Sequence, residues 1–129
     1  ANENSVVLTV EYGAFRAVFG GDAGVPMERL RAASIGDVTM LKVGHHGSRG
    51  ASSDAWIGAL KPEVCVIEVG ARNRYGHPDP GVVARLRYAG CAVWRTDRAG
   101  DVRVSTDGRA VVVQSAAGDT TFLIRKELP

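Results

Sequence analysis

Two short and almost entirely apolar runs constrain the fold of this chain more than any other feature of its sequence. They are residues 38–43 and residues 64–69, and the second run reads Val-Cys-Val-Ile-Glu-Val. An apolar run without polar alternation is typical of a strand that is covered on both faces, as in a parallel sheet between two layers. Helical patterns separate these runs from each other and from a later strand, so we expect strand–helix repeats in an α/β domain.

The rest of the sequence predicts a hairpin at the start and an antiparallel meander at the end. Apolar runs at residues 5–12 and 14–19 flank Gly13, which is a hairpin signal. Helices are expected at residues 26–33, 53–60 and 80–89, where Pro26 suits a first turn and Asp79 suits an N-cap. Further strands are expected at residues 92–95, 101–105, 110–115 and 120–125. The pattern therefore predicts a mixed sheet with flanking helices and a C-terminal antiparallel meander.

Composition is consistent with one domain that spans residues 1–129. The chain is 45% hydrophobic and carries a formal net charge of +2, and 13 of its 16 basic residues are arginines. Arginine favours bidentate contacts with phosphate, so the composition allows a nucleic-acid or nucleotide substrate without requiring one. No apolar run approaches the ~18 residues that a membrane span needs, and the first residues lack the pattern of a signal peptide. We therefore expect a soluble domain.

The two cysteines, Cys65 and Cys91, lie within or directly beside predicted strands that contain valine or isoleucine. A thiol in such surroundings usually behaves as a small buried hydrophobic group. No CxxC or zinc-knuckle spacing is present, and two separate cysteines do not indicate an oxidising compartment. A bridge between them is compatible with the sequence, but we expect both thiols to be buried and reduced.

Candidate functional residues follow three consecutive predicted strands. Asp22 follows the strand at residues 14–19, and His45 and His46 follow the strand at residues 38–43. A polar loop at residues 70–79 follows the strand at residues 64–69 and contains His77. Because the carboxyl ends of parallel strands meet at one edge of a sheet, we expect these side chains to converge there.

The convergence of three histidines and one carboxylate favours a metal site. Zinc and manganese accept mixed nitrogen and oxygen ligands, and such an ion can polarise a water molecule for hydrolysis. The plain alternative is that the three histidines are unrelated surface residues.

Taken together, the motifs in these loops resemble a known family. Gly21-Asp22 follows an apolar strand, Leu-Lys-Val-Gly-His-His-Gly-Ser occupies residues 41–48, and Asn-Arg-Tyr-Gly-His-Pro occupies residues 73–78. An Arg-Thr-Asp-Arg-x-Gly turn follows at residues 95–100. In this combination and order, the chain resembles the metallo-β-lactamase-like domain of the ComEC/Rec2 competence proteins, which are DNA-uptake channel proteins.

The resemblance implies roles for individual residues. Asp22 matches an aspartate that can bridge two metal ions, and His45 matches a histidine ligand that follows a strand-ending glycine. His46 matches a position facing the ligands or the substrate, although either histidine of the pair could bind the metal. His77 is placed to meet a metal ion or the scissile phosphate. Asn4 and Ser5 match a stretch in which other branches carry a further histidine. The residues expected to line the substrate site are Ser48, Arg72, Asn73, Arg74 and Tyr75.

One departure from the family pattern decides how much of the domain we expect here. The main ligand cluster of the superfamily, His-x-His-x-Asp-His or a variant, lies upstream of the Gly-Asp strand and is absent from these residues. We therefore expect the chain to correspond to the second half of a metallo-β-lactamase-like αββα sandwich.

The resemblance implies part of a metal-dependent phosphodiesterase or nuclease that hydrolyses single- or double-stranded DNA through a metal-activated water. Its cofactor would be zinc or manganese, with two ions in the complete domain, and the chain alone would be inactive. The parent protein would lie in the bacterial cell membrane and carry a transmembrane channel domain. The alternative is a non-catalytic module that retains the fold and binds nucleic acid or a protein partner.

Overall fold

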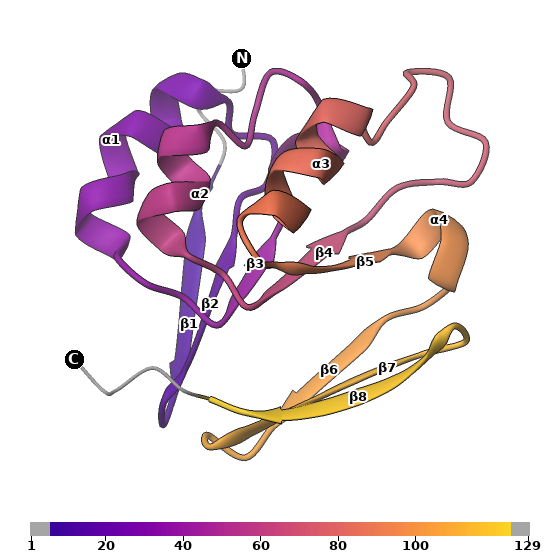
Figure 1. Ribbon diagram of the computed structural model, residues 1–129. Coiled ribbons are helices and arrows are strands. Elements are labelled where there is room, and N and C mark those ends of the chain that lie inside the picture. The colour runs from indigo at the N-terminus through magenta and orange to yellow at the C-terminus, as the bar shows by residue number, and fades with distance from the viewer. Residues whose placement is uncertain (1–5, 125–129) are drawn as a thin grey trace.

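A five-stranded mixed sheet forms the centre of the protein in the computed structural model, which describes residues 6–124 (Figure 1). Its strands lie in the order β1 (Leu8–Tyr12), β2 (Phe15–Phe19), β3 (Met40–Lys42), β4 (Val64–Ile67) and β5 (Ala92–Arg95). β1 is antiparallel to β2, whereas β2 to β5 are all parallel. Asn4 and Ser5, which the sequence singles out, lie outside the described residues.

Helices and a second sheet cover the two faces of this central sheet. The helices α1 (Val25–Ile35), α2 (Asp54–Leu60) and α3 (Pro80–Tyr88) pack on one face. The antiparallel sheet of β6 (Arg103–Thr106), β7 (Ala110–Ser115) and β8 (Gly118–Leu123) packs on the other (Figure 1). A short helix α4 (Thr96–Ala99) joins β5 to β6. The layers are therefore helices, mixed sheet and antiparallel sheet.

The core consists of two apolar clusters because side chains alternate between the faces of each strand. Leu41 and Cys65 point to the helices and pack with Leu60 and Leu86, all four at 0% exposure. The alternate positions, which include Met40 and Val64, pack against the second sheet. All four residues of β4 are buried. This confirms the prediction that this apolar run is a strand covered on both faces.

The α/β class, the hairpin, the three helices, the parallel strands and the C-terminal meander are confirmed. Two predicted caps are also confirmed: Ser53 accepts a hydrogen bond from Trp56 N, and Asp79 accepts hydrogen bonds from Gly81 N and Val82 N. Two elements are not predicted by the sequence pattern. They are α4 and a 3₁₀ turn at Gly44–Gly47, which stand where a turn and a loop are expected.

The prediction of reduced cysteines is wrong, because Cys65 and Cys91 form a disulfide. Cys65 lies in β4, and Cys91 directly precedes β5, which pairs in parallel with β4. The register pairs Val64 with Ala92, so the two Cα atoms lie 6.1 Å apart, within bridging range. Both cysteines are buried, as expected, at 0% and 4% exposure. The sequence does not reveal this register, so it does not predict the bond.

The central sheet is incompletely covered near its β1 edge. A groove of about 390 Å³ lies between the two sheets and is lined mainly by apolar residues, among them Val10, Phe19 and Val104. All five residues of β1 are exposed, and Leu8 and Tyr12 are 53% and 59% exposed.

No helix among residues 6–124 is long and apolar enough to cross a membrane.

Candidate functional site

Three loops meet at one edge of the central sheet, as the sequence predicts. They follow the carboxyl ends of β2, β3 and β4, which are adjacent and parallel. Backbone hydrogen bonds join them: His45 N donates to Gly21 O at 2.6 Å, and Asp79 N donates to Gly47 O at 2.8 Å. The loop at residues 70–79 is thereby held against the 3₁₀ turn, which is held against the loop after β2.

The 3₁₀ turn places both adjacent histidines in a restricted backbone conformation. His45 and His46 have φ values of 51° and 53°, in the left-handed region that non-glycine residues seldom occupy. Such a conformation costs roughly 1–3 kcal/mol per residue and persists only where the surroundings enforce it. Gly47 also has a positive φ, and a Cβ atom there would lie 2.6 Å from Pro78 Cβ. The close approach of the loop at residues 70–79 therefore requires glycine at position 47.

Asp22 and His46 form the closest pair of candidate metal-binding side chains. The distance from His46 Nε2 to Asp22 Oδ1 is 3.9 Å, and the two side chains are 48% and 58% exposed. His46 Nδ1 lies 2.8 Å from the carbonyl oxygen of Glu68. Because a carbonyl can only accept a hydrogen bond, Nδ1 donates to Glu68 O, and this bond turns Nε2 of the ring toward Asp22.

His45 and His77 form a second pair, separate from the first. Their ring centroids lie 6.0 Å apart, and the His77 ring in turn lies 5.7 Å from that of Tyr75. Within residues 6–124, no three histidine, cysteine, aspartate or glutamate side chains gather closely enough to hold a metal ion. The structure thus does not bring Asp22, His45 and His77 together as the predicted ligand set. It places His46, rather than His45, beside Asp22.

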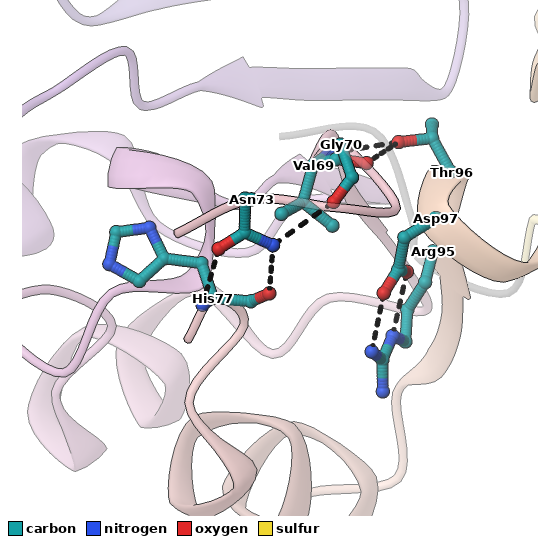
Figure 2. Close-up of polar contacts among 7 residues, drawn as sticks. All are labelled: Val69, Gly70, Asn73, His77, Arg95, Thr96 and Asp97. Atoms are coloured by element: carbon teal, nitrogen blue, oxygen red, sulfur yellow. Dashed lines mark hydrogen bonds and ion pairs between the residues drawn. The ribbon is translucent and has the colours of Figure 1, made fainter. Parts of the chain in front are cut away.

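The loop at residues 70–79 is organised by one side chain, that of Asn73 (Figure 2). Asn73 Oδ1 accepts hydrogen bonds from Tyr75 N and His77 N, and Nδ2 donates to Gly70 O and His77 O. These four bonds use both amide hydrogens and both main lone-pair directions. The substrate contact predicted for Asn73 would therefore need one of these bonds to break.

The turn motif at residues 95–100 anchors the start of the same loop (Figure 2). Thr96 Oγ1 accepts a hydrogen bond from Val69 N at 2.8 Å and donates one to Val69 O at 3.0 Å. Arg95 and Asp97 form a two-bond ion pair, with side chains that are 15% and 12% exposed. The guanidinium of Arg95 holds the pKa of Asp97 below its usual value. The sequence match includes this motif but does not indicate its anchoring role.

A buried carboxylate fixes the segment that follows the histidines, and the sequence reasoning missed it. Glu28 of α1 is 3% exposed and accepts hydrogen bonds from Ser52 N and Ser53 N. Arg85 of α3 donates to Ser52 O at 3.1 Å. Glu28 resembles an ordinary helix-surface residue in the sequence, because the loop that it holds is distant along the chain.

Two of the remaining predicted substrate-binding residues, Ser48 and Tyr75, line a polar pocket of about 410 Å³. Its lining includes Ser48, Arg49, Tyr75 and His77. Ser48 Oγ accepts a hydrogen bond from Gly50 N, whereas Arg72 and Arg74 lie exposed on the loop that carries Tyr75. Arg49, which the sequence reasoning did not assign, is exposed and lines the pocket.

Comparison with known proteins identifies similar segments in three much longer proteins. The chain is 32% identical over 115 residues to Recombination protein 2 of Haemophilus influenzae, a match that covers 89% of this chain. It is 34% identical to ComE operon protein 3 of Bacillus subtilis and to Competence protein ComA of Neisseria gonorrhoeae, over 79% and 77% of this chain. This chain is a homologue of a segment of each of these three proteins.

The chain spans only 13–15% of the length of these three relatives. No protein-family model matches the chain. The similarity supports the competence-protein part of the family resemblance, and the metallo-β-lactamase-like assignment stays a prediction.

Proposed function

We propose that this chain is part of a metal-dependent DNA hydrolase domain within a competence protein. Its role would be in DNA uptake, in a parent protein that also carries a transmembrane channel part in the bacterial cell membrane. One relative is named as a competence protein, a second as a protein of the ComE operon, and a third as a recombination protein. DNA is the substrate most consistent with these names and with the arginine-rich loop beside the site.

The observation that carries the proposal is the Asp22–His46 pair. A histidine that donates one ring hydrogen to a backbone carbonyl keeps its other nitrogen fixed in direction, and metal-binding histidines commonly have such a partner. His46 has this partner in Glu68 O, and its other ring nitrogen, Nε2, faces Asp22. An imidazole nitrogen and a carboxylate oxygen are donor types that zinc and manganese accept.

These residues fit only part of a metal site, because no third donor side chain among residues 6–124 joins the pair. We propose that the other ligands belong to the parent protein, upstream of Asp22 in sequence. A metal ion bound there would supply the activation of water for attack on phosphorus. The residues of this chain would hold one side of the ion through Asp22 and His46, while Arg72 and Arg74 would bind the phosphate backbone.

The uncovered surface supports the view that this is the second half of a metallo-β-lactamase-like αββα sandwich. Helices cover one outer face of the two packed sheets, whereas every residue of β1 is exposed and the groove beside it is apolar. A contiguous exposed apolar surface commonly marks a contact with another part of the protein or with a partner. We propose that upstream residues of the parent cover this surface.

The test is metal-dependent cleavage of DNA by this chain and by a version extended upstream by about one domain length. We expect no appreciable cleavage by the chain alone and cleavage by the extended version in zinc or manganese. Asp22→Ala should abolish cleavage in the extended version, whereas the exposed Asp37→Ala should retain it. Robust cleavage by the 129-residue chain itself would contradict the half-domain proposal.

The alternative function is a non-catalytic module that binds DNA or a protein partner. It is favoured by one observation, the lack of any three-donor cluster among the described residues. An extended version that binds DNA but leaves it intact in every divalent metal tested would support this alternative.

A further inference from the structure

Tyr75 is an exposed aromatic side chain on a loop beside the candidate site, and the hydrogen bonds of Asn73 hold the backbone of that loop. The side chain is 82% exposed, although its backbone is fixed by the hydrogen bond from Tyr75 N to Asn73 Oδ1. Its ring lies 5.7 Å from that of His77, with an angle of 30° between the ring planes. The ring is therefore supported on one side and open to solvent elsewhere.

The surroundings of Tyr75 are polar and cationic. Tyr75 lines the 410 Å³ pocket together with Ser48 and Arg49, and Arg72 and Arg74 flank it along the loop. Within residues 6–124, none of these three arginines forms an ion pair. The carboxylate that lines the pocket, Asp79, is engaged as the N-cap of α3 by the backbone N–H groups of Gly81 and Val82.

Proteins that bind single-stranded nucleic acid commonly combine exposed aromatic rings with positively charged groups, as Tyr75 and the arginines without an ion pair among residues 6–124 do here. Each base can stack on an aromatic face, and the arginines attract the phosphates. In an intact duplex the neighbouring base pairs cover both faces of every internal base, so only an unpaired base can stack in this way. Tyr75 belongs to the same group of loops as the Asp22–His46 pair, since the His77 ring lies near both its own ring and that of His45, which directly precedes His46.

We propose that Tyr75 and the pocket between Ser48 and His77 form a subsite for one unpaired nucleobase. The site would then bind single-stranded DNA, or a frayed end, in preference to intact duplex. This inference rests on the proposed function, because it specifies the form of DNA that the same site accepts.

The experiment measures binding of fluorescently labelled DNA to the 129-residue chain by anisotropy. Three probes of about 12 nucleotides are compared: a single strand, its duplex, and a single strand with abasic positions that retain every phosphate. The variants are Tyr75→Ala, Tyr75→Phe and Tyr88→Ala. Tyr88 is a matched control, because it is 96% exposed at the far end of α3.

We expect the unmodified chain to bind the single strand more tightly than the duplex or the abasic strand. Tyr75→Ala should weaken single-strand binding about tenfold, since stacking on one aromatic ring contributes roughly 1–3 kcal/mol per base. Duplex binding should change little. Tyr75→Phe should keep the preference because it keeps the ring, and Tyr88→Ala should have no effect.

Three results would overturn the inference while leaving the proposed function in place. They are unchanged single-strand binding by Tyr75→Ala, an equal loss for single strand and duplex, or equal binding of the abasic strand. If Tyr75→Ala leaves single-strand binding unchanged, the exposed ring does not stack on a base and is a candidate for contact with a protein instead. Failure of the chain to bind any of the three probes would contradict the proposed DNA substrate itself, and the subsite with it.

Discussion

Asn73 has the most concentrated structural role of any residue near the site, because its four hydrogen bonds define the loop that carries Tyr75 and His77. These bonds lie partly in solvent, so each contributes a modest net free energy of about 0.5–1.5 kcal/mol. The loop nevertheless depends on them, since most of its other residues are exposed.

Asn73→Ala should therefore release the loop and lower the free energy of unfolding by about 2 kcal/mol. Limited proteolysis with trypsin offers a local measurement, because Arg72 and Arg74 lie on this loop. Cleavage after these arginines should accelerate in the variant. The exposed Arg29→Ala serves as a control and should not change the rate at the loop. Unaltered loop cleavage and an unaltered melting temperature in Asn73→Ala would contradict this role.

Asp97 links stability to pH through its ion pair with Arg95. The pair lowers the pKa of Asp97 in the folded protein below the usual value of 3.8. The stabilisation is consequently complete above that usual value and is lost as the pH falls through the lowered pKa. A hydrogen bond to a charged group contributes about 1.5–3 kcal/mol to the stability of the folded protein.

Asp97→Asn should thus destabilise the protein by about 1.5–3 kcal/mol at neutral pH. The difference in unfolding free energy between the two proteins should shrink as the pH falls below 3.8, where the carboxylate of the unfolded chain binds a proton, and should be lost below the lowered pKa of the native carboxylate. Chemical denaturation at a series of pH values measures this difference. Asp119→Asn, an exposed carboxylate with no ion pair among the described residues, should show neither effect. A difference that stays constant down to pH 2 would exclude the ion pair as its cause.

Among the elements, the parallel pair β4 and β5 is held by both hydrogen bonds and the Cys65–Cys91 disulfide. The bond closes a segment of sequence separation 26 that contains the loop at residues 70–79 and α3. In the chain-entropy description, the cross-link lowers the entropy of the unfolded chain. This stabilises the folded protein by about 3 kcal/mol.

Reduction of the disulfide with dithiothreitol should therefore lower the melting temperature by several degrees. The cause is the loss of about 3 kcal/mol of stability that the disulfide contributes. The double variant Cys65→Ala, Cys91→Ala should melt at a reduced temperature that dithiothreitol no longer changes. Differential scanning calorimetry measures both. Identical melting of the unmodified chain with and without reductant would mean that the bond does not contribute.

The predicted and observed elements agree where short-range patterns decide the structure. The unbroken apolar run of β4 indicates burial on both faces, and Asp79 before Pro80 marks the start of α3. The left-handed conformation of His45 and His46 has no such local signal, because it occurs where the turn contacts distant residues, Gly21 O through His45 N and Glu68 O through His46 Nδ1. The sequence for the same reason cannot reveal that His46 rather than His45 faces Asp22.

Contacts between distant residues account for the other omissions. The disulfide depends on the register of β4 with β5, and Thr96 binds Val69 across 27 positions of sequence. Glu28 holds Ser52 and Ser53 from another element. Each of these partners becomes identifiable only once the strands are assembled.

At the scale of the whole molecule, the fold places an incomplete candidate metal site at one edge of the central sheet and leaves another surface uncovered. The edge carries Asp22, His46 and the arginine-rich loop, whereas every residue of β1 is exposed and the apolar groove runs between the two sheets. Both features are consistent with a chain that functions together with further residues of its parent. We propose that Asp22 and His46 act as one unit on the ion that this larger domain would bind.

The most direct test is a double-mutant cycle on DNA cleavage by the upstream-extended version of the chain. Residues that act as a unit give strongly non-additive effects. Asp22→Ala and His46→Ala should each reduce the cleavage rate at least about 100-fold, and the double variant should be no slower than either, while His45→Ala should retain more activity than His46→Ala. Multiplicative losses, or an active His46→Ala beside an inactive His45→Ala, would contradict the pairing of Asp22 with His46.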